Sequence, residues 1–282
     1  MRRVIGNVTR TGLRTGHSAV SVLLYTAAAV VAVAGVWALW EGWRPEPPMP
    51  EERFVVDDPI VHIPKTGLVA RVSVQDAEDA VRAIEALHRG RVTAVALQAP
   101  VQAMPQAISR TRSAFPRRVL IGVSGAHAAR DVQEAVRAGA EFVLLTSLEP
   151  DAIRVCQDAR VPAIPGAFTA TEIGQAWSLR TGLVALFPAG QAGPGYVREV
   201  LRESPGITIV AAGGITPENA GDFIRAGAAA VVAGDEWAGG EARDYDAMTR
   251  RARAFVETID RARTRPIRPA PPIRPIEGPD IQ

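Results

Sequence analysis

The feature that most constrains the fold is a regular alternation, beyond residue 65, of short apolar runs with amphipathic helical windows. Eight such pairs follow one another before the carboxyl terminus. Runs that are apolar on both faces are typical of parallel strands covered by helices, and eight of them predict an α/β protein with a (β/α)8 TIM barrel over residues 67–262. We expect the strands at residues 69–74, 92–97, 119–123, 142–145, 162–165, 183–187, 208–212 and 229–233.

Helix-capping residues support this alternation. Asp76 precedes a helical window over residues 77–88, and Pro217 opens another window that ends at Gly227. A last helix is expected over residues 244–263. The boundaries of several helices are therefore predicted independently of the strands.

An uncharged segment, residues 18–40, lies far upstream of the barrel. It is long enough to cross the ~30 Å hydrocarbon layer of a bilayer. Trp37, Trp40 and Trp43 stand where an interfacial aromatic belt would lie. A cleaved signal peptide is the alternative, but its apolar region is shorter and ends at a small-residue cleavage site. We expect a single transmembrane helix.

The flanks of this segment predict its orientation. Residues 1–17 carry arginines and no acid, which predicts a cytoplasmic amino terminus and a barrel on the periplasmic side of a bacterial inner membrane. Within the segment, Ala28, Ala32 and Gly35 share one helical face, a pattern that permits close packing of a second helix and that also arises by chance in alanine-rich sequence.

Proline-rich stretches flank the barrel on both sides. Residues 41–66 combine prolines with charges and predict an extended linker. Residues 263–282 repeat an Arg-Pro-Ile triplet and predict a polyproline or irregular tail. Together with the membrane segment, these appendages favour attachment to partner subunits of a membrane complex.

Composition narrows the chemistry. The 32 basic and 30 acidic residues nearly balance, which does not favour nucleic acid as a partner. Cys156 is the only cysteine, and the four histidines are scattered without metal-ligand spacing. We therefore expect neither a metal nor another cofactor.

Three blocks carry a family resemblance. They are Val161-Pro162-Ala163-Ile164-Pro165-Gly166 with Thr169-Ala170-Thr171-Glu172, then Leu186-Phe187-Pro188-Ala189, then Gly213-Gly214-Ile215-Thr216-Pro217-Glu218-Asn219-Ala220. In order and spacing the chain resembles the 2-keto-3-deoxy-6-phosphogluconate (KDPG) and 4-hydroxy-2-oxoglutarate aldolases. The resemblance implies a TIM barrel and a class I mechanism, in which a lysine forms a Schiff base with the keto acid and a glutamate moves protons.

The residues of this mechanism are replaced. The resemblance places Ala185 where the Schiff-base lysine belongs, Ala94 at the general acid/base glutamate and Gln98 at the substrate-binding arginine. A methyl group cannot attack a carbonyl. The only lysine, Lys65, precedes the first strand and is expected at the opposite end of the barrel.

The family's anion-binding loops are kept in part. Gly213 and Gly214 are retained, whereas Asp235 falls where a phosphate-facing serine is expected, so that an anion would meet repulsion there. The three residues mark a vestigial anion site, and a tight turn that needs no ligand is the alternative for the two glycines.

These losses predict a chain that is not an enzyme, a non-catalytic accessory or scaffold subunit of a bacterial membrane complex such as a photosynthetic or respiratory assembly. Two alternatives stay open. The barrel could be a membrane-anchored module that binds a small molecule, or an enzyme with altered, non-Schiff-base chemistry that uses carboxylates such as Glu172, Asp235 and Glu236.

Overall fold

The structure is a computed structural model, and it describes residues 58–98, 100–234 and 244–264. The predicted membrane segment with its tryptophans and small residues, the carboxyl-terminal tail, and Asp235 with Glu236 lie outside these residues. Within the described ranges, none of the helices has the length and apolar character needed to cross a membrane.

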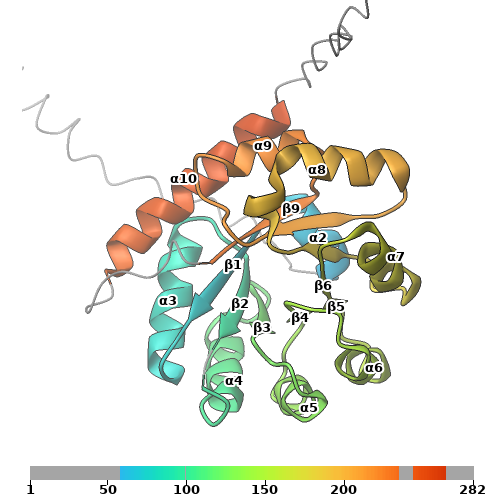
Figure 1. Ribbon diagram of the computed structural model, residues 1–282. Coiled ribbons are helices and arrows are strands. Elements are labelled where there is room, and N and C mark those ends of the chain that lie inside the picture. The colour runs from blue at the N-terminus through green and yellow to red at the C-terminus, as the bar shows by residue number, and fades with distance from the viewer. Residues whose placement is uncertain (1–57, 99, 235–243, 265–282) are drawn as a thin grey trace, which may run out of the picture. The chain divides into compact units, whose positions relative to one another are not determined.

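The described residues form one parallel sheet in the order β5-β4-β3-β2-β1-β9-β8-β7-β6 (Figure 1). The strands are β1 Leu68–Ser73, β2 Ala94–Gln98, β3 Leu120–Ser124, β4 Val143–Leu144, β5 Ala163–Ile164, β6 Gly166–Ala167, β7 Val184–Leu186, β8 Ile209–Ala212 and β9 Ala230–Ala233. Each predicted strand overlaps an observed one within a few residues.

The two ends of this sheet meet at Pro165, which separates β5 from β6. β5 pairs with β4 and β6 pairs with β7, while the Pro165 carbonyl accepts a 2.8 Å hydrogen bond from the Ala185 amide. Proline has no N–H to donate, so the ladder is interrupted at that residue. The two short strands act together as the predicted fifth strand, and the sheet is a nearly closed barrel.

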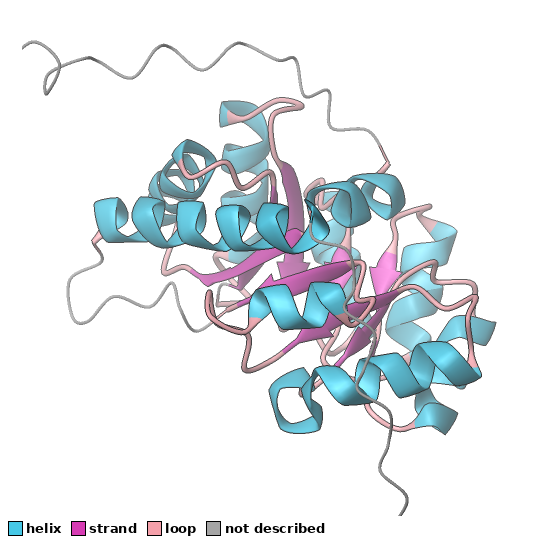
Figure 2. Cartoon of the chain, turned by 90° about the horizontal axis from the view of Figure 1, so that it is seen from above, coloured by secondary structure: helices cyan, strands magenta, loops and turns pink. Residues whose placement is uncertain are grey.

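Helices surround this sheet (Figure 2). They are α2 Pro59–Thr66, α3 Ala77–Arg89, α4 Met104–Ala114, α5 Ala129–Arg137, α6 Pro150–Asp158, α7 Ala170–Ser178, α8 Ala189–Glu203, α9 Ala220–Arg225 and α10 Tyr245–Thr264. The predicted cap at Asp76 is confirmed, since its side chain accepts from the amides of Glu78 and Asp79 at the start of α3.

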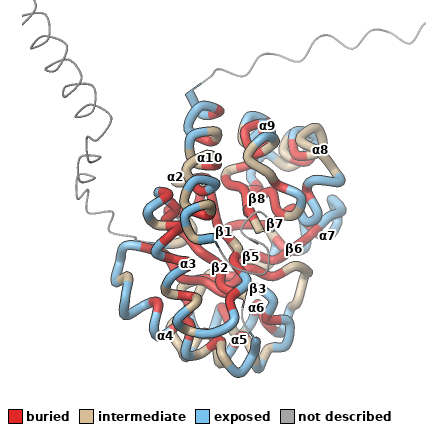
Figure 3. Tube along the Cα trace, turned by 90° about the vertical axis from the view of Figure 1, so that its left-hand side faces the viewer, coloured by how far each residue is buried: buried red, intermediate tan, exposed pale blue. Residues whose placement is uncertain are grey.

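Strand side chains alternate between two apolar layers. On β7, Val184 and Leu186 face the helices, whereas Ala185 faces the barrel interior. The ring of Phe142, the residue before β4, fills part of the interior and occupies the space that a side chain at Gly122 of β3 would need. Buried residues therefore concentrate on the strands, with exposed ones on the outer helices (Figure 3).

The end of the predicted linker is a helix rather than extended chain. The Asp58 carboxylate accepts from the Ile60 amide and Pro59 occupies the first turn, where a missing N–H costs nothing. Ile63 is fully buried and belongs to the interior cluster of the barrel. The helix α2 thus closes the amino-terminal end of the barrel and buries apolar surface there. The high proline content of this segment gave no indication of the helix.

Candidate functional site

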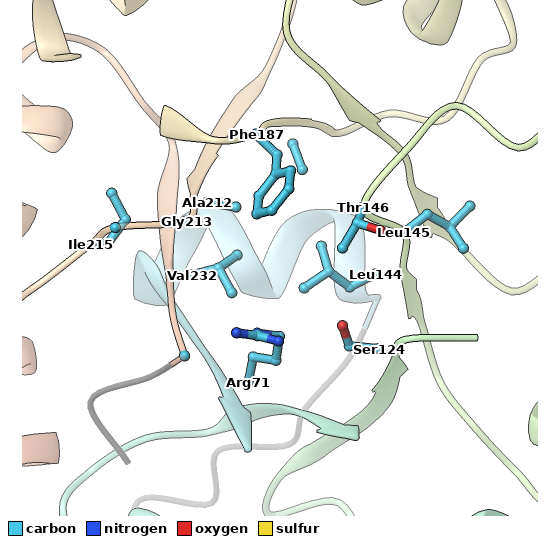
Figure 4. Close-up of a pocket in the computed structure, with 13 residues that line it drawn as sticks. Arg71, Ser124, Leu144, Leu145, Thr146, Phe187, Ala212, Gly213, Ile215 and Val232 are labelled. Atoms are coloured by element: carbon cyan, nitrogen blue, oxygen red, sulfur yellow. The ribbon is translucent and has the colours of Figure 1, made fainter. Parts of the chain in front are cut away.

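An open pocket lies at the carboxyl-terminal ends of the strands. Its volume is about 610 Å³, including the part open to solvent. The lining residues come from most of the strands and from the turns that follow them (Figure 4): Arg71, Ser124, Leu144, Leu145, Thr146, Ala185, Phe187, Ala212, Gly213, Gly214, Ile215, Val232 and Gly234. This end of a parallel barrel is where side chains from different strands converge on one ligand.

Arg71 brings a positive charge into the pocket. It stands between Ala70 and Val72, which pack against the helices, so its own side chain faces the interior. Its Nη1 donates to Oε1 of Gln98 at 2.8 Å. A Cβ at Gly234 would lie 2.7 Å from Arg71 Nη2, so the absence of a side chain at that position leaves room for the guanidinium.

Ser124 contributes a hydroxyl at the end of β3. The residue is 1% exposed, and its Oγ has no hydrogen-bond partner within the described part of the chain. A buried hydroxyl without a partner is costly and requires an explanation. The side chains of Ser124 and Arg71 both extend toward the space beneath Phe187 (Figure 4), so a ligand in the pocket would find two polar side chains on one wall.

Gly213 and Gly214 form the turn after β8. Both have positive φ, 83° and 71°, and the Gly213 carbonyl accepts a 2.8 Å hydrogen bond from the Gly190 amide. A Cβ at Gly213 would lie 2.8 Å from the Phe187 ring. Conformation and close packing therefore both require glycine here, and the same turn exposes backbone to the pocket.

The predicted site residues are only partly brought together. Ala185 lines the pocket beside Gly213 and Gly214. Ala94 lies in the barrel interior, fully buried, and is not among the lining residues. Gln98 contacts the pocket indirectly, by accepting the hydrogen bond from Arg71.

The carboxylate proposed from sequence as an alternative reactive group has a structural role. Glu172 accepts 2.9 Å hydrogen bonds from the amides of Phe168 and Thr169 and completes a capping box at the start of α7. The hydrogen bonds from the Thr169 and Phe168 amides lower the pKa of Glu172, so it stays ionised. Among the described residues, those lining the pocket include no carboxylate and no lysine.

Metal-ligating side chains are dispersed over the described ranges. Nowhere in them do three His, Cys, Asp or Glu residues come together in a group able to hold a metal ion. The chemistry available to the pocket from these residues is that of a guanidinium, two hydroxyls and backbone groups.

Sequence reasoning missed Arg71. The signal was present, because Arg71 is the one charge in the apolar run Leu68–Ser73 and the alternation of that strand assigns it to the interior. An unexpected charge at an inward position of a barrel strand is a functional-site signal in its own right.

A parallel α/β barrel with an open pocket at the carboxyl ends of its strands has the organisation of TIM-barrel enzymes. Over residues 60–250 the sequence matches the KDPG and KHG aldolase family, and the chain belongs to that family. The predicted resemblance and barrel fold are confirmed.

Individual relatives agree with this assignment. The chain is 28% identical over 159 residues to 2-dehydro-3-deoxy-6-phosphogalactonate aldolase of Escherichia coli (strain K12), covering 56% of this chain and 77% of that protein. It is 28% identical over 161 residues to 2-dehydro-3-deoxy-phosphogluconate aldolase of Treponema pallidum (strain Nichols), covering 57% and 76%. A native KDPGal structure superposes with a TM-score of 0.64 at 24% identity, covering 69% of this chain and 95% of the other.

The prediction that the chain is not an enzyme is wrong on this comparison, because the matching family and the named relatives are aldolases. The replaced side chains at Ala94, Gln98 and Ala185 do not by themselves exclude catalysis. A barrel can change the groups that perform its chemistry while it keeps the pocket.

Proposed function

We propose that this protein is an aldolase-family enzyme that binds a small anionic substrate in the pocket and acts on it without a lysine Schiff base. The observation that carries the proposal is the guanidinium of Arg71, which lines the same pocket as Ala185, the alanine that the resemblance puts at the Schiff-base position. The substrates named for the relatives are phosphorylated sugar acids, so compounds of that class are the first to test.

Arg71 suits the binding of an oxyanion. A guanidinium stays charged at any physiological pH and presents several N–H donors in a planar fork that matches a carboxylate or a phosphate. One donor, Nη1, is held by Gln98, which restricts the rotation of the group. Gln98 replaces the arginine implied by the resemblance, and the positive charge now comes from the neighbouring strand β1.

The same group supports chemistry at a carbonyl. Negative charge that develops on an oxygen in the transition state is stabilised by donors fixed in advance around it. Arg71 and the hydroxyl of Ser124 would supply such donors from one wall, and backbone groups of the Gly213–Gly214 turn face the same space. Polarisation by these donors would take the place of an iminium as the electron sink.

The described residues that line the pocket provide no amine on which a Schiff base could form. Ala185 has only a methyl group, and Lys65, the only lysine of the sequence, lies in the last turn of α2 at the amino-terminal end of the barrel. The pocket opens at the other end, so the Lys65 side chain cannot reach a substrate there.

The test combines binding and turnover with the full chain. Pyruvate and 2-dehydro-3-deoxy-6-phosphogluconate are expected to raise the melting temperature, whereas the uncharged ketone acetone is not. Substrate consumption is followed by proton NMR. Arg71→Gln is expected to weaken binding about 30-fold, as the loss of a charge-assisted hydrogen bond would.

Arg82→Gln on the exposed surface of α3 is the matched control, and it should leave binding unchanged. Equal stabilisation by the uncharged ketone, or unchanged affinity in Arg71→Gln, would contradict the proposal.

The predicted association with a membrane complex stays a prediction. The segments that would mediate it, including the predicted single span, lie outside the described residues. It is compatible with an anchored enzyme whose pocket faces away from the point where the chain enters the barrel.

A further inference from the structure

Backbone conformation singles out four arginines. Among the described residues, every residue other than glycine that has a positive φ is an arginine: Arg91, Arg117, Arg160 and Arg180, at 70°, 58°, 57° and 55°. Each is exposed. Each follows a helix, respectively α3, α4, α6 and α7, and precedes the next strand.

The left-handed position after a helix is normally occupied by glycine or asparagine, because a Cβ is disfavoured there. This chain uses glycine at the equivalent place after α5, at Gly139, and after α9, at Gly227. Glycine and arginine therefore both occupy this left-handed position within the same barrel. Strained residues that persist at several equivalent sites point to a function for their side chains.

A helix-dipole explanation does not account for Arg91 and Arg117, whereas Arg160 and Arg180 follow helices α6 and α7, which have no other cation in the last turn. A cation anywhere in the last turn of a helix interacts favourably with its carboxyl-terminal end. Arg89 in α3 and Arg112 in α4 already occupy such positions without a left-handed backbone. The arginines with positive φ add charge beyond the helix ends, on the turns themselves.

All four turns lie on one face of the barrel. Connections from helix to strand gather at the amino-terminal ends of the strands, opposite the pocket. The described chain also enters there, because α2 leads directly into β1, and Arg263 near the end of α10 donates to the carbonyls of Pro64 and Lys65. We refer to the four arginine turns together with Lys65 as the basic face.

Neighbouring acids neutralise this face only in part. Arg91 lies 3.6 Å from Asp260, with both side chains about half exposed, and such pairs are weak in water. Asp158 precedes Arg160 at the end of α6 and is exposed. All four arginines are nevertheless exposed on this face.

We propose that the basic face binds the anionic phospholipid headgroups of a bilayer. Guanidinium groups spread over one face match many phosphates at once, which suits a lipid surface better than a single ligand. The position of the chain favours lipid, because the predicted membrane span ends at residue 40 and α2 begins at Pro59. The intervening segment can reach at most about 60 Å, so the predicted span would keep the face that receives it within that distance of the bilayer.

The test measures contact directly with the full chain. The protein is reconstituted in nanodiscs of phosphatidylcholine alone and of phosphatidylcholine mixed equally with phosphatidylglycerol. Hydrogen–deuterium exchange then reports on the four turns. In the anionic discs we expect their amide exchange to slow about fivefold or more, and high salt to reverse the effect.

Matched variants separate the effect of removing charge from any effect on the fold. R91Q/R117Q/R160Q/R180Q keeps a Cβ at every left-handed position and removes the charge, so it should lose the lipid-dependent protection. The corresponding four Arg→Lys substitutions should keep it. A control, R82Q/R110Q/R130Q/R198Q, removes the same charge from exposed positions on α3, α4, α5 and α8 and should behave like the parent.

Three outcomes would overturn the proposal. The first is equal exchange in both lipid compositions. The second is an equal loss of protection in the control variant. The third is protection in native membranes but not in anionic discs that hold no other membrane protein. That result would show that the face binds an acidic protein instead.

Discussion

The two ends of the barrel differ in how their interior is filled. At the amino-terminal end, Ile63 fills the interior and exposed arginines surround the opening. At the carboxyl-terminal end the interior stays open, and Arg71 and Ser124 reach into it between apolar walls. Because packing is concentrated at one end and polar groups at the other, changes at one end should leave the other intact.

The largest expected effect is on stability at the closed end. Ile63→Ala removes a fully buried side chain from the interior cluster and should lower the free energy of unfolding by about 3 kcal/mol. Urea denaturation measures this loss, and Val61→Ala on the exposed side of the same helix is the control. A loss below about 1 kcal/mol would mean that α2 does not close the barrel.

A smaller effect of opposite sign is expected at the open end. Ser124→Ala removes a buried hydroxyl that has no partner among the described residues, and should raise the free energy of unfolding of the ligand-free protein by about 1 kcal/mol. Ligand affinity should fall in the same variant.

Thr111→Val provides the contrast for Ser124→Ala. The Thr111 hydroxyl is also buried, but it donates to the Ala107 carbonyl at 2.7 Å, so its removal should destabilise by about 1 kcal/mol. If both substitutions changed the free energy of unfolding in the same direction, the proposal that the Ser124 hydroxyl is kept for a ligand would be contradicted.

The pH dependence of stability should reflect His88, in the last turn of α3. Burial, and then the charge of Arg118, lower the pKa of His88 below its ordinary value of 6.5. The unfolded chain therefore takes up a proton at a higher pH than the native protein, so stability is full above pH 6.5 and falls as the pH drops toward the native pKa. This loss is at most about 1.4 kcal/mol per pH unit.

His88→Leu should flatten this part of the stability curve, as measured by thermal unfolding between pH 5 and 8, a range in which few other side chains titrate. An unchanged slope in the variant would assign the pH dependence to other groups.

The smallest expected effect concerns the left-handed turns. Arg160→Gly relieves a disfavoured conformation but adds freedom to the unfolded chain, and the balance should stabilise the protein by about 0.5 kcal/mol. Arg154→Gly within α6 is the opposite control, since glycine there should destabilise by about 1 kcal/mol. Destabilisation by Arg160→Gly would show that the arginine is kept for the fold.

Much of the fold followed from local signals. The strands were predicted because each is a short run that is apolar on both faces, and the cap at Asp76 uses only neighbouring residues. The helix α2 was not predicted, since its stability depends on Ile63 entering a cavity formed by distant strands. The proline content predicted an extended chain there and carried no information about that contact.

The site was less predictable for a related reason. The resemblance located Ala185, Gly213 and Gly214, which the structure places in one pocket. It could not reveal Arg71, because the replacement charge stands on a different strand from the arginine that Gln98 replaces. The charge itself was visible in the run Leu68–Ser73, but its pairing with Gln98 is seen only when the two strands lie side by side.

The most direct test of the central claim is borohydride trapping with pyruvate, followed by intact-mass measurement of the wild type and of A185K. The wild type should gain no mass, because no amine lies in the pocket, while Arg71 still gives it a pyruvate-dependent rise in melting temperature. The A185K variant, which restores an amine at a pocket-lining position, should gain the mass of one reduced pyruvate. A pyruvate adduct on the wild type would contradict the account.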